Sequence, residues 1–185
     1  YQPTEIAVSS GCKQLLFNAL MATLNRGDEV IIPAPYWVSY SAMVEIADGR
    51  PIIIPCAAEQ QFKLTPDKLE SAVTSATRWL ILNSPSNPTG AVYTRTELLA
   101  LAEVLLQHPE VLVITDDIYE HLIYGDVEFA TLAQVEPRLK ERTLTCNGMS
   151  KAYCMTGWRI GFAGGPKSLI RAMAKLQSQS SFHPA

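Results

Sequence analysis

Short apolar segments alternate with amphipathic segments along almost the whole chain, and this alternation constrains the fold more than any other feature. Seven segments are apolar and mostly β-branched, which is typical of strands covered on both faces of a sheet. We expect these strands at residues 6–9, 29–32, 51–54, 79–83, 111–115, 143–146 and 159–163. Strands that alternate with helices predict a doubly wound α/β fold, in which helices cover both faces of a mainly parallel seven-stranded sheet as a three-layer α/β/α domain.

Four helices are predicted from periodicity and from end signals. Apolar residues between 16 and 24 recur at three- and four-residue steps, and Gly27 closes that helix. Thr65-Pro66 has the form of an N-cap followed by proline at the first helical position. Thr94 and Glu97 have the spacing of a capping box, which opens a helix towards residue 107. Gly165-Pro166 precedes the last helix.

Composition and charge exclude several classes of protein. Hydrophobic residues make up 48% and charged residues 18% of the 185 residues, which predicts one globular domain rather than a disordered chain. A net charge of -3 gives no reason to expect a nucleic acid or an anionic membrane surface as a partner. No apolar stretch approaches the roughly 20 residues of a membrane-spanning helix. The first residues have neither the basic nor the apolar region of a signal peptide.

Cysteine and histidine positions predict neither disulfide bonds nor a metal site. The four cysteines, at 12, 56, 146 and 154, form no CxxC pair, so a reducing, cytoplasmic setting is expected. The three histidines, at 108, 121 and 183, lie at no ligand spacing from one another. We expect His121 to pack or hydrogen-bond beside the end of the 111–115 strand rather than to bind a metal.

Polar motifs follow closely on several predicted strands. They are Gly11-Cys12-Lys13, the run Ser84 to Gly90 with Asn87, Asp116-Asp117-Ile118-Tyr119, and the segment from Asn147 to Gly161 with Lys151 and Arg159. Ligands of doubly wound sheets bind beyond the carboxyl ends of the strands, so these motifs are expected to form one site. They supply an amine, a guanidinium, a carboxylate and two hydrogen-bond donors. Pyridoxal phosphate requires this set for its aldehyde, phosphate, ring nitrogen and phenolate oxygen.

The order and the residues of these motifs resemble those of the class I aminotransferases, which are fold-type I pyridoxal-phosphate enzymes. The resemblance extends over essentially the whole chain. The resemblance implies that Lys151 forms the covalent link to the cofactor and then acts as base and acid in the proton shift. It implies that Asp116, with Asp117 as the rival, pairs with the pyridinium nitrogen. It also implies that Tyr119 and Asn87 donate to the phenolate oxygen, and that the Asn87-Pro88 peptide bond is cis.

The remaining cofactor contacts are also implied by the resemblance. Arg159 matches the arginine that chelates the phosphate, and the backbone of Gly11-Cys12-Lys13 lies where amides at a helix start contact it. Many relatives carry Gly or Ala at Cys12, so only its backbone is expected to take part. Trp37 matches the aromatic residue that stacks on the pyridine ring. Gly148 replaces a phosphate-binding Ser or Thr of many aminotransferases, and Ser150 does not substitute for it in register.

The function implied by the resemblance is transfer of an amino group between an amino acid and a 2-oxo acid. Trp37 favours the aspartate-type branch. Two alternatives remain open: a C–S or other β-eliminating lyase, which uses the same residues, and a non-catalytic pyridoxal-phosphate-binding regulatory module. Residues 1–185 match the cofactor-binding large domain of this family. The resemblance therefore implies a homodimeric protein about twice as long, with an N-terminal arm and a C-terminal domain, and little activity for this chain alone.

Overall fold

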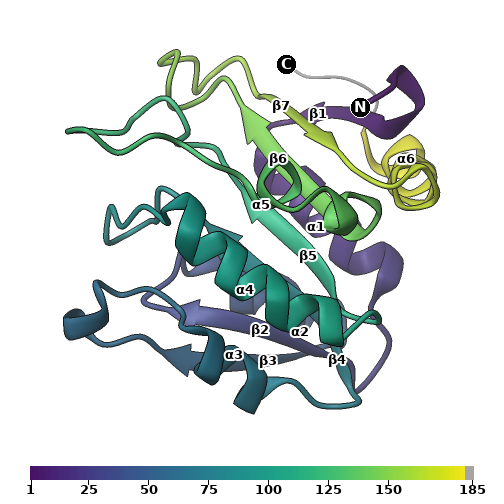
Figure 1. Cartoon of the computed structure of the whole chain (residues 1–185). Coiled ribbons are helices and arrows are strands. Elements are labelled where there is room, and N and C mark those ends of the chain that lie inside the picture. The colour runs from purple at the N-terminus through teal and green to yellow at the C-terminus, as the bar shows by residue number, and fades with distance from the viewer. Residues whose placement is uncertain (182–185) are drawn as a thin grey trace.

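All seven predicted strands are present, and their bounds differ from the predicted ones by no more than two residues. The computed structural model describes residues 1–181, so His183 lies outside the described residues. The strands form one sheet in the order β1-β7-β6-β5-β4-β2-β3 (Figure 1). They are β1 (Ile6–Ser10), β2 (Glu29–Ala34), β3 (Arg50–Pro55), β4 (Thr77–Asn83), β5 (Leu112–Asp116), β6 (Thr143–Gly148) and β7 (Ile160–Gly164).

The sheet is parallel except at β7, which runs antiparallel to both of its neighbours, β1 and β6. An antiparallel neighbour needs no crossover helix, so the chain passes from β6 to β7 through a loop, residues 149–159, at the carboxyl end of β6. The predicted lysine and arginine, Lys151 and Arg159, both lie on this loop. The reversal of β7 thus brings both side chains to the edge of the sheet where the other motifs lie.

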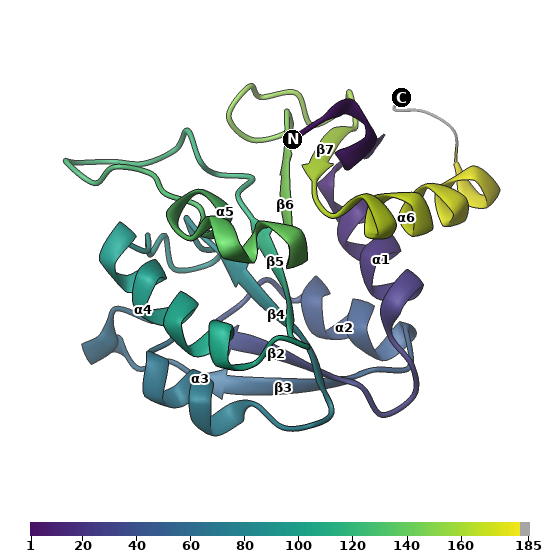
Figure 2. The same cartoon turned by 45° about the vertical axis from the view of Figure 1, so that its right-hand side comes forward.

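Helices cover both faces of the sheet, as predicted, and each face has its own apolar core (Figures 1 and 2). One core lies under α1, α2 and α6, and the other lies under α3, α4 and α5. The helices are α1 (Cys12–Thr23), α2 (Ser39–Ile46), α3 (Pro66–Ala72), α4 (Arg95–Gln107), α5 (Leu132–Val135) and α6 (Lys167–Ser180). Short 3-10 helices span Pro3–Glu5, Ala58–Gln60 and Pro137–Arg142.

The helix ends agree with most of the predicted signals. At α4 the Oγ1 of Thr94 accepts from the backbone N–H of Glu97 at 3.3 Å, and the Glu97 carboxylate accepts from Thr94, so the predicted capping box is confirmed. Pro66 is the first residue of α3, although the side chain of Thr65 makes no capping hydrogen bond. Helix α1 ends at Thr23, before Gly27, because Leu24 already has an extended backbone.

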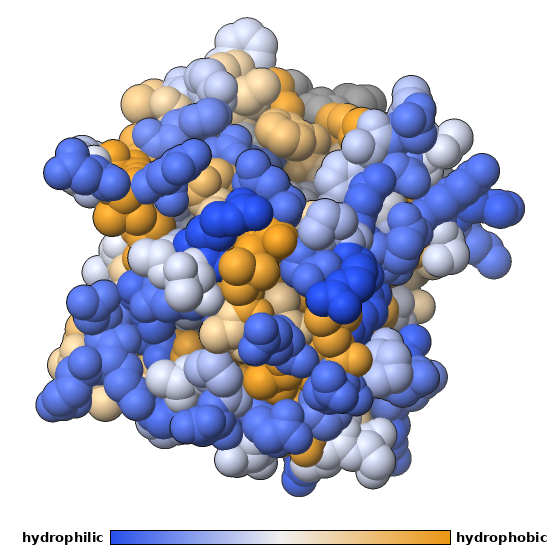
Figure 3. Space-filling view, viewed as in Figure 1, coloured by the Kyte–Doolittle hydropathy of each residue, from blue (hydrophilic) through white to orange (hydrophobic). Residues whose placement is uncertain are grey.

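The outer surface over α3, α4 and α5 is mostly hydrophilic, with small separate hydrophobic patches (Figure 3). This pattern fits helices that bury one apolar stripe and expose the other side to water. In the part of the chain that the structure describes, every helix is too short or too polar to cross a bilayer.

Candidate active site

A cavity of about 190 Å³ opens at the carboxyl edge of the sheet, between the ends of β4, β5 and β6 and the starts of α1 and α2. The structure brings eight of the nine predicted site residues to its wall, and the ninth, Gly11, lies against the guanidinium of Arg159. The eight are Cys12, Lys13, Trp37, Asn87, Asp116, Tyr119, Lys151 and Arg159. The rule that ligands bind beyond the carboxyl ends of parallel strands therefore located this cavity correctly.

The bottom of the cavity is formed by Cys12, Tyr40, Asn83 and Asp116, which we call the floor. Asp116 is the last residue of β5, and only 4% of it is exposed. Its Oδ2 accepts from the Tyr40 hydroxyl at 2.6 Å, and its Oδ1 accepts from the Ile118 backbone N–H at 3.4 Å. Burial raises the pKa of the Asp116 carboxyl, and the Tyr40 hydrogen bond opposes that rise.

Asp116, rather than Asp117, faces the cavity. Asp117 is also buried, but its side chain lies outside the cavity wall, and its Oδ2 has no hydrogen-bond partner. Burial raises the pKa of the Asp117 carboxyl well above its usual range, and the neighbouring Asp116 adds to that rise. Successive strand residues point to opposite sides of a sheet, which explains why adjacent acids have such different surroundings.

Asn83, which the sequence analysis did not select, joins the floor to the loop that carries Asn87. Its Nδ2 donates to the backbone carbonyl of Asp116 at 2.7 Å, and its Oδ1 accepts from the backbone N–H of Asn87 at 2.7 Å. The Asn87-Pro88 bond is cis, as predicted. A polar residue at the end of the apolar strand β4 was the sequence signal that could have identified Asn83.

Residues 149–159 form the open side of the cavity, and we call them the mouth loop. Lys151 is exposed there, with its Nζ 5.7 Å from the centroid of the Tyr119 ring. Lys151 is accessible because it lies on an irregular loop beyond the end of β6. The Nη1 of Arg159 donates to the Thr156 carbonyl at 2.9 Å and to the Ser150 hydroxyl at 3.4 Å.

The mouth loop and the start of α1 together form a cradle for an anion. Gly11 has a φ of +84°, and a Cβ at this position would overlap the guanidinium of Arg159. The first-turn amides of Cys12 and Lys13 have no acceptor within their own helix, so they are free to face a phosphate. Ser150 also lines the cavity beside Arg159, although its position in the sequence does not match the phosphate-binding Ser or Thr of many aminotransferases.

At Gly148 the structure gives a steric reason for glycine. A Cβ there would lie 2.8 Å from the carbonyl oxygen of Ile160 on the neighbouring strand β7. Serine or threonine at this position would therefore force β6 and β7 apart. The absence of a hydroxyl at Gly148 follows from the close pairing of these strands.

Trp37 forms one wall of the cavity. Its ring packs edge-on against Tyr40, with the centroids 5.4 Å apart, and the Nζ of Lys13 lies 4.8 Å from the centroid of the Trp37 ring. Lys13, Lys151 and Arg159 are three cations around one buried carboxylate, so the cavity favours a ligand with several negative charges.

The side chains present fit pyridoxal phosphate. The cradle of Gly11, Cys12 and Arg159 suits a phosphate dianion, and the buried Asp116 carboxylate suits a cationic ring nitrogen. Trp37 offers an aromatic face, and Lys151 offers an accessible amine. A negative group and three positive groups of the protein thus line one cavity, which suits the cofactor's own charges.

The histidines and cysteines lie mostly apart from this chemistry. His121 is exposed, with its Nε2 3.1 Å from Glu120 and its ring edge-on to Tyr153, so it packs at the surface as expected. All four cysteines are free. Among residues 1–181, no cluster of three histidine, cysteine, aspartate or glutamate side chains has the arrangement of a metal site.

Comparison with known proteins agrees with this chemistry. The family model described as "Aminotransferase class I and II" matches residues 1–185. An aspartate/prephenate aminotransferase of Cereibacter sphaeroides is 62% identical over 184 residues, and an aspartate aminotransferase of Rhizobium meliloti is 58% identical over 185 residues. These matches cover 100% of this chain but 46% and 45% of the two relatives, so the chain spans less than half of their length.

Solved structures give the same result for the fold. The crystal structure of the Rhizobium meliloti aspartate aminotransferase superposes with a TM-score of 0.98 at 58% identity, covering 100% of this chain and 46% of that one. The Thermus thermophilus aspartate aminotransferase with maleate superposes with a TM-score of 0.94 at 46% identity, covering 100% of this chain and 47% of that one. The chain therefore belongs to the class I and II aminotransferases, a family that depends on pyridoxal 5'-phosphate.

Proposed function

We propose that residues 1–185 are the cofactor-binding large domain of an aminotransferase that moves an amino group from an amino acid to a 2-oxo acid. One observation carries the proposal: the buried Asp116 lies at the floor of the same cavity whose mouth holds Lys151 and Arg159. A carboxylate is costly to bury without a cationic partner, and a cationic ring in this cavity would supply one in direct contact.

Each site residue then has one task. When bound, pyridoxal phosphate supplies an aldehyde that captures the amino group and a ring that withdraws electrons from it. Asp116 would hold the proton on the ring nitrogen, and Arg159 with the start of α1 would hold the phosphate. The Nζ of Lys151 would hold the cofactor covalently and, once released, would move the proton at the substrate Cα.

The donors Tyr119 and Asn87 and the aromatic wall Trp37 orient the ring. Asn87 is held by Asn83, which in turn is bonded to the Asp116 backbone, so the donor and the carboxylate are fixed relative to each other. Holding reacting groups in a fixed geometry removes much of the entropic barrier of the reaction. The cavity wall therefore supports positioning as well as binding.

We further propose an acidic substrate of the aspartate type. Lys13 at the cavity wall adds a cation that the phosphate and the ring do not require, and a second carboxylate on the substrate would complement it. Relatives that are 62% and 58% identical are named aspartate/prephenate and aspartate aminotransferase, which supports the same choice. The residues that line the cavity give no specific reason to prefer a lyase or a regulatory module over an aminotransferase.

The proposal extends to a homodimer in a reducing, cytoplasmic compartment. Val38 and Ile46, at the ends of α2, are 77% and 64% exposed, which is unusual for large apolar side chains and supports contact with a second subunit. Four free cysteines support a reducing setting. The 45–46% coverage of the relatives supports a longer polypeptide around this domain.

The proposal is tested on the full-length protein that contains residues 1–185. Adding aspartate to the cofactor-loaded protein should change the absorbance of the bound cofactor, and adding 2-oxoglutarate should reverse the change. Borohydride reduction followed by peptide mapping should place the cofactor on Lys151. Label on another lysine would overturn the assignment of Lys151. Release of pyruvate, ammonia and hydrogen sulfide from cysteine, without amino transfer, would favour a lyase.

A further inference from the structure

Two side chains from different helices contact the carboxylate of Asp116, one at each oxygen. The hydroxyl of Tyr40, on α2, donates to Oδ2 at 2.6 Å. The thiol of Cys12, the first residue of α1, donates to Oδ1 at 3.7 Å. Both side chains line the cavity, but the atoms that meet the carboxylate are the Tyr40 hydroxyl and the Cys12 thiol. Their polar atoms are therefore the informative feature.

A carboxylate that is fully buried loses its water, and its donors must replace that water if it is to stay ionised. At Asp116 the other nearby donor is the Ile118 backbone N–H, at 3.4 Å. Tyr40 is 2% exposed, and its ring packs edge-on against Trp37, so its hydroxyl has little freedom to turn away. Tyr40 and Cys12 together hold the carboxylate, and we call this pair the clamp. Tyr40 is the fixed strong donor on one side, and the Cys12 thiol is the weaker donor on the other.

We propose that Cys12 and Tyr40 are positioning residues that hold the Asp116 carboxylate in the orientation in which it faces the cofactor ring. Neither touches the reacting atoms, and both act through Asp116. This inference rests on the proposed function for its purpose, because the ring nitrogen is the group that the carboxylate meets. The hydrogen bonds of Tyr40 and Cys12 to Asp116 are present in the structure and do not depend on which substrate is used.

Other ionisable groups around Asp116 do not replace the clamp. The buried thiol of Cys146, on β6, lies beside Cys12, and burial raises its pKa, so it stays neutral. Asp117, the residue after the end of β5, is a like charge when ionised, and it opposes ionisation of Asp116. Lys151 favours the ionised form but approaches from the mouth loop. Tyr40 and Cys12 are the side chains that donate hydrogen bonds directly to the Asp116 oxygens.

The test reads the protonation of Asp116 directly, in the cofactor-free full-length protein. The infrared band of its protonated carboxyl is isolated by subtracting the spectrum of Asp116→Asn, and its intensity is followed against pH. Tyr40→Phe removes the strong donor, Cys12→Ala removes the weak one, and Cys12→Ser restores a donor. Tyr36→Phe is the matched control, because the Tyr36 hydroxyl makes no hydrogen bond to Asp116.

Tyr40→Phe should raise the midpoint of the Asp116 band by about one to two pH units, because a hydrogen bond to the charged form is lost. Cys12→Ala should raise it by less than one unit, since a thiol is a weak donor. Cys12→Ser should return the midpoint towards the unmodified protein, and Tyr36→Phe should leave it unchanged. The dissociation constant of pyridoxal phosphate should rise about tenfold in Tyr40→Phe, if one pKa unit of interaction is lost.

The proposal fails if the midpoint in Tyr40→Phe equals that in Tyr36→Phe. It fails for Cys12 if alanine and serine at that position give the same midpoint. These outcomes are separate from the proposed function: a protein that shows the midpoint shifts but transfers no amino group would retain the clamp and refute the aminotransferase assignment. A misfolded Tyr40→Phe protein leaves the Cys12 pair to decide, because Cys12 is only partly buried and changes by a single atom in Cys12→Ser.

Discussion

The floor and the mouth loop of the cavity differ in how the protein holds them. On the floor, Tyr40 and Asp116 are 2% and 4% exposed and share a 2.6 Å hydrogen bond. In the mouth loop, Tyr153 and Trp158 are 54% and 62% exposed, and Lys151 is exposed as well. The two regions supply the same proposed site, yet the floor is buried and the mouth loop is largely exposed.

This difference separates two kinds of task. Groups that meet the fixed ring of the cofactor benefit from a preorganised environment, since their orientation then costs nothing when the ligand binds. The lysine must form a covalent link, lose it to substrate and then move a proton, so it needs freedom of movement. Secondary-structure ends suit the first task, and a loop suits the second.

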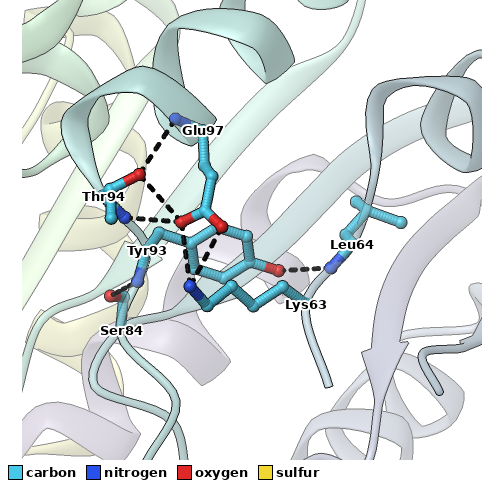
Figure 4. A network of polar contacts seen from close by, with 6 residues as sticks. All are labelled: Lys63, Leu64, Ser84, Tyr93, Thr94 and Glu97. Atoms are coloured by element: carbon cyan, nitrogen blue, oxygen red, sulfur yellow. Dashed lines mark hydrogen bonds and ion pairs between the residues drawn. The ribbon is translucent and has the colours of Figure 1, made fainter. Parts of the chain in front are cut away.

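A network of polar contacts includes Ser84, the residue that follows Asn83 of the floor (Figure 4). Tyr93 accepts a hydrogen bond from the backbone N–H of Leu64 at 2.7 Å, and its own N–H donates to the Ser84 hydroxyl at 3.0 Å. Lys63 donates to both oxygens of Glu97, at 3.0 and 2.9 Å. The loop that carries Asn87 lies between Ser84 and Tyr93, so both of its ends are anchored.

The largest effect is expected in the mouth loop. Lys151→Ala should lower turnover in the full-length protein by roughly 10²–10⁴-fold or more, because it removes the proton carrier and the covalent link. Because Lys151 is exposed, its loss should change the free energy of unfolding by less than about 0.5 kcal/mol. Single-turnover kinetics and urea denaturation measure the two effects. Lys167→Ala, at the exposed start of α6, is the control, and an equal loss of activity there would contradict the assignment.

On the floor, Asp116→Ala should leave the cofactor able to attach but slow the proton-transfer step. Losing the ion pair with the ring should cost about 3–5 kcal/mol, or roughly 10²–10⁴-fold in rate. The measurement is the rate of absorbance change after mixing with aspartate. Asp126→Ala, at an exposed position, is the matched control. Near-native rates in Asp116→Ala would point to Asp117 or to a ring without a carboxylate partner.

The sequence predicted which residues lie at the strand ends better than it predicted the contacts between floor residues. Asp116 and Asn87 follow apolar strands, and the carboxyl-end rule places such residues together without knowledge of their contacts. Tyr40 was missed because it is 76 residues from Asp116 in the chain, and a local pattern carries no information about such a contact. The donor role of the Cys12 thiol was missed for the same reason, at a separation of 104 residues.

The helices show the same limit. Helix α4 was predicted because its start is determined by a local capping box. Helix α2 was not predicted, since its N-cap, Val38, makes no side-chain capping hydrogen bond and the preceding residues are aromatic. Helix α5 has four residues, too few for an apolar period to appear. Tertiary packing determines these two helices, and it is visible only in the structure.

The network of polar contacts is tested by Tyr93→Phe, which leaves the buried N–H of Leu64 without its acceptor. The free energy of unfolding should fall by about 1–3 kcal/mol, the cost of an unsatisfied buried polar group. Urea denaturation measures it, with Tyr124→Phe as the control because Tyr124 is 86% exposed. Equal stabilities for the two variants would show that this network contributes nothing.

The buried Asp117, next to Asp116 of the floor, should make the stability of the protein depend on pH. Its pKa is raised by burial, so the folded state binds the proton more tightly than the unfolded state does. The contribution of Asp117 to the free energy of unfolding is therefore most favourable below the ordinary aspartate pKa. It is lost as the pH rises from that value through the raised pKa of the folded state. Asp117→Asn should flatten this fall and gain about 1–3 kcal/mol at the alkaline end. Denaturation at several pH values tests it, and parallel curves for the two proteins would contradict it.

The smallest effect is expected for Trp158→Ala in the mouth loop. Trp158 is 62% exposed, so removing its ring should change the free energy of unfolding by less than about 0.5 kcal/mol. The same substitution at Trp79 should cost about 3–5 kcal/mol, because that ring is 0% exposed and its Nε1 donates to Thr23 at 2.8 Å. Thermal and urea denaturation of the two variants compare one residue type in both surroundings. A loss at Trp158 comparable to that at Trp79 would mean that the mouth loop is packed in the full-length protein, and the contrast with the floor would then be lost.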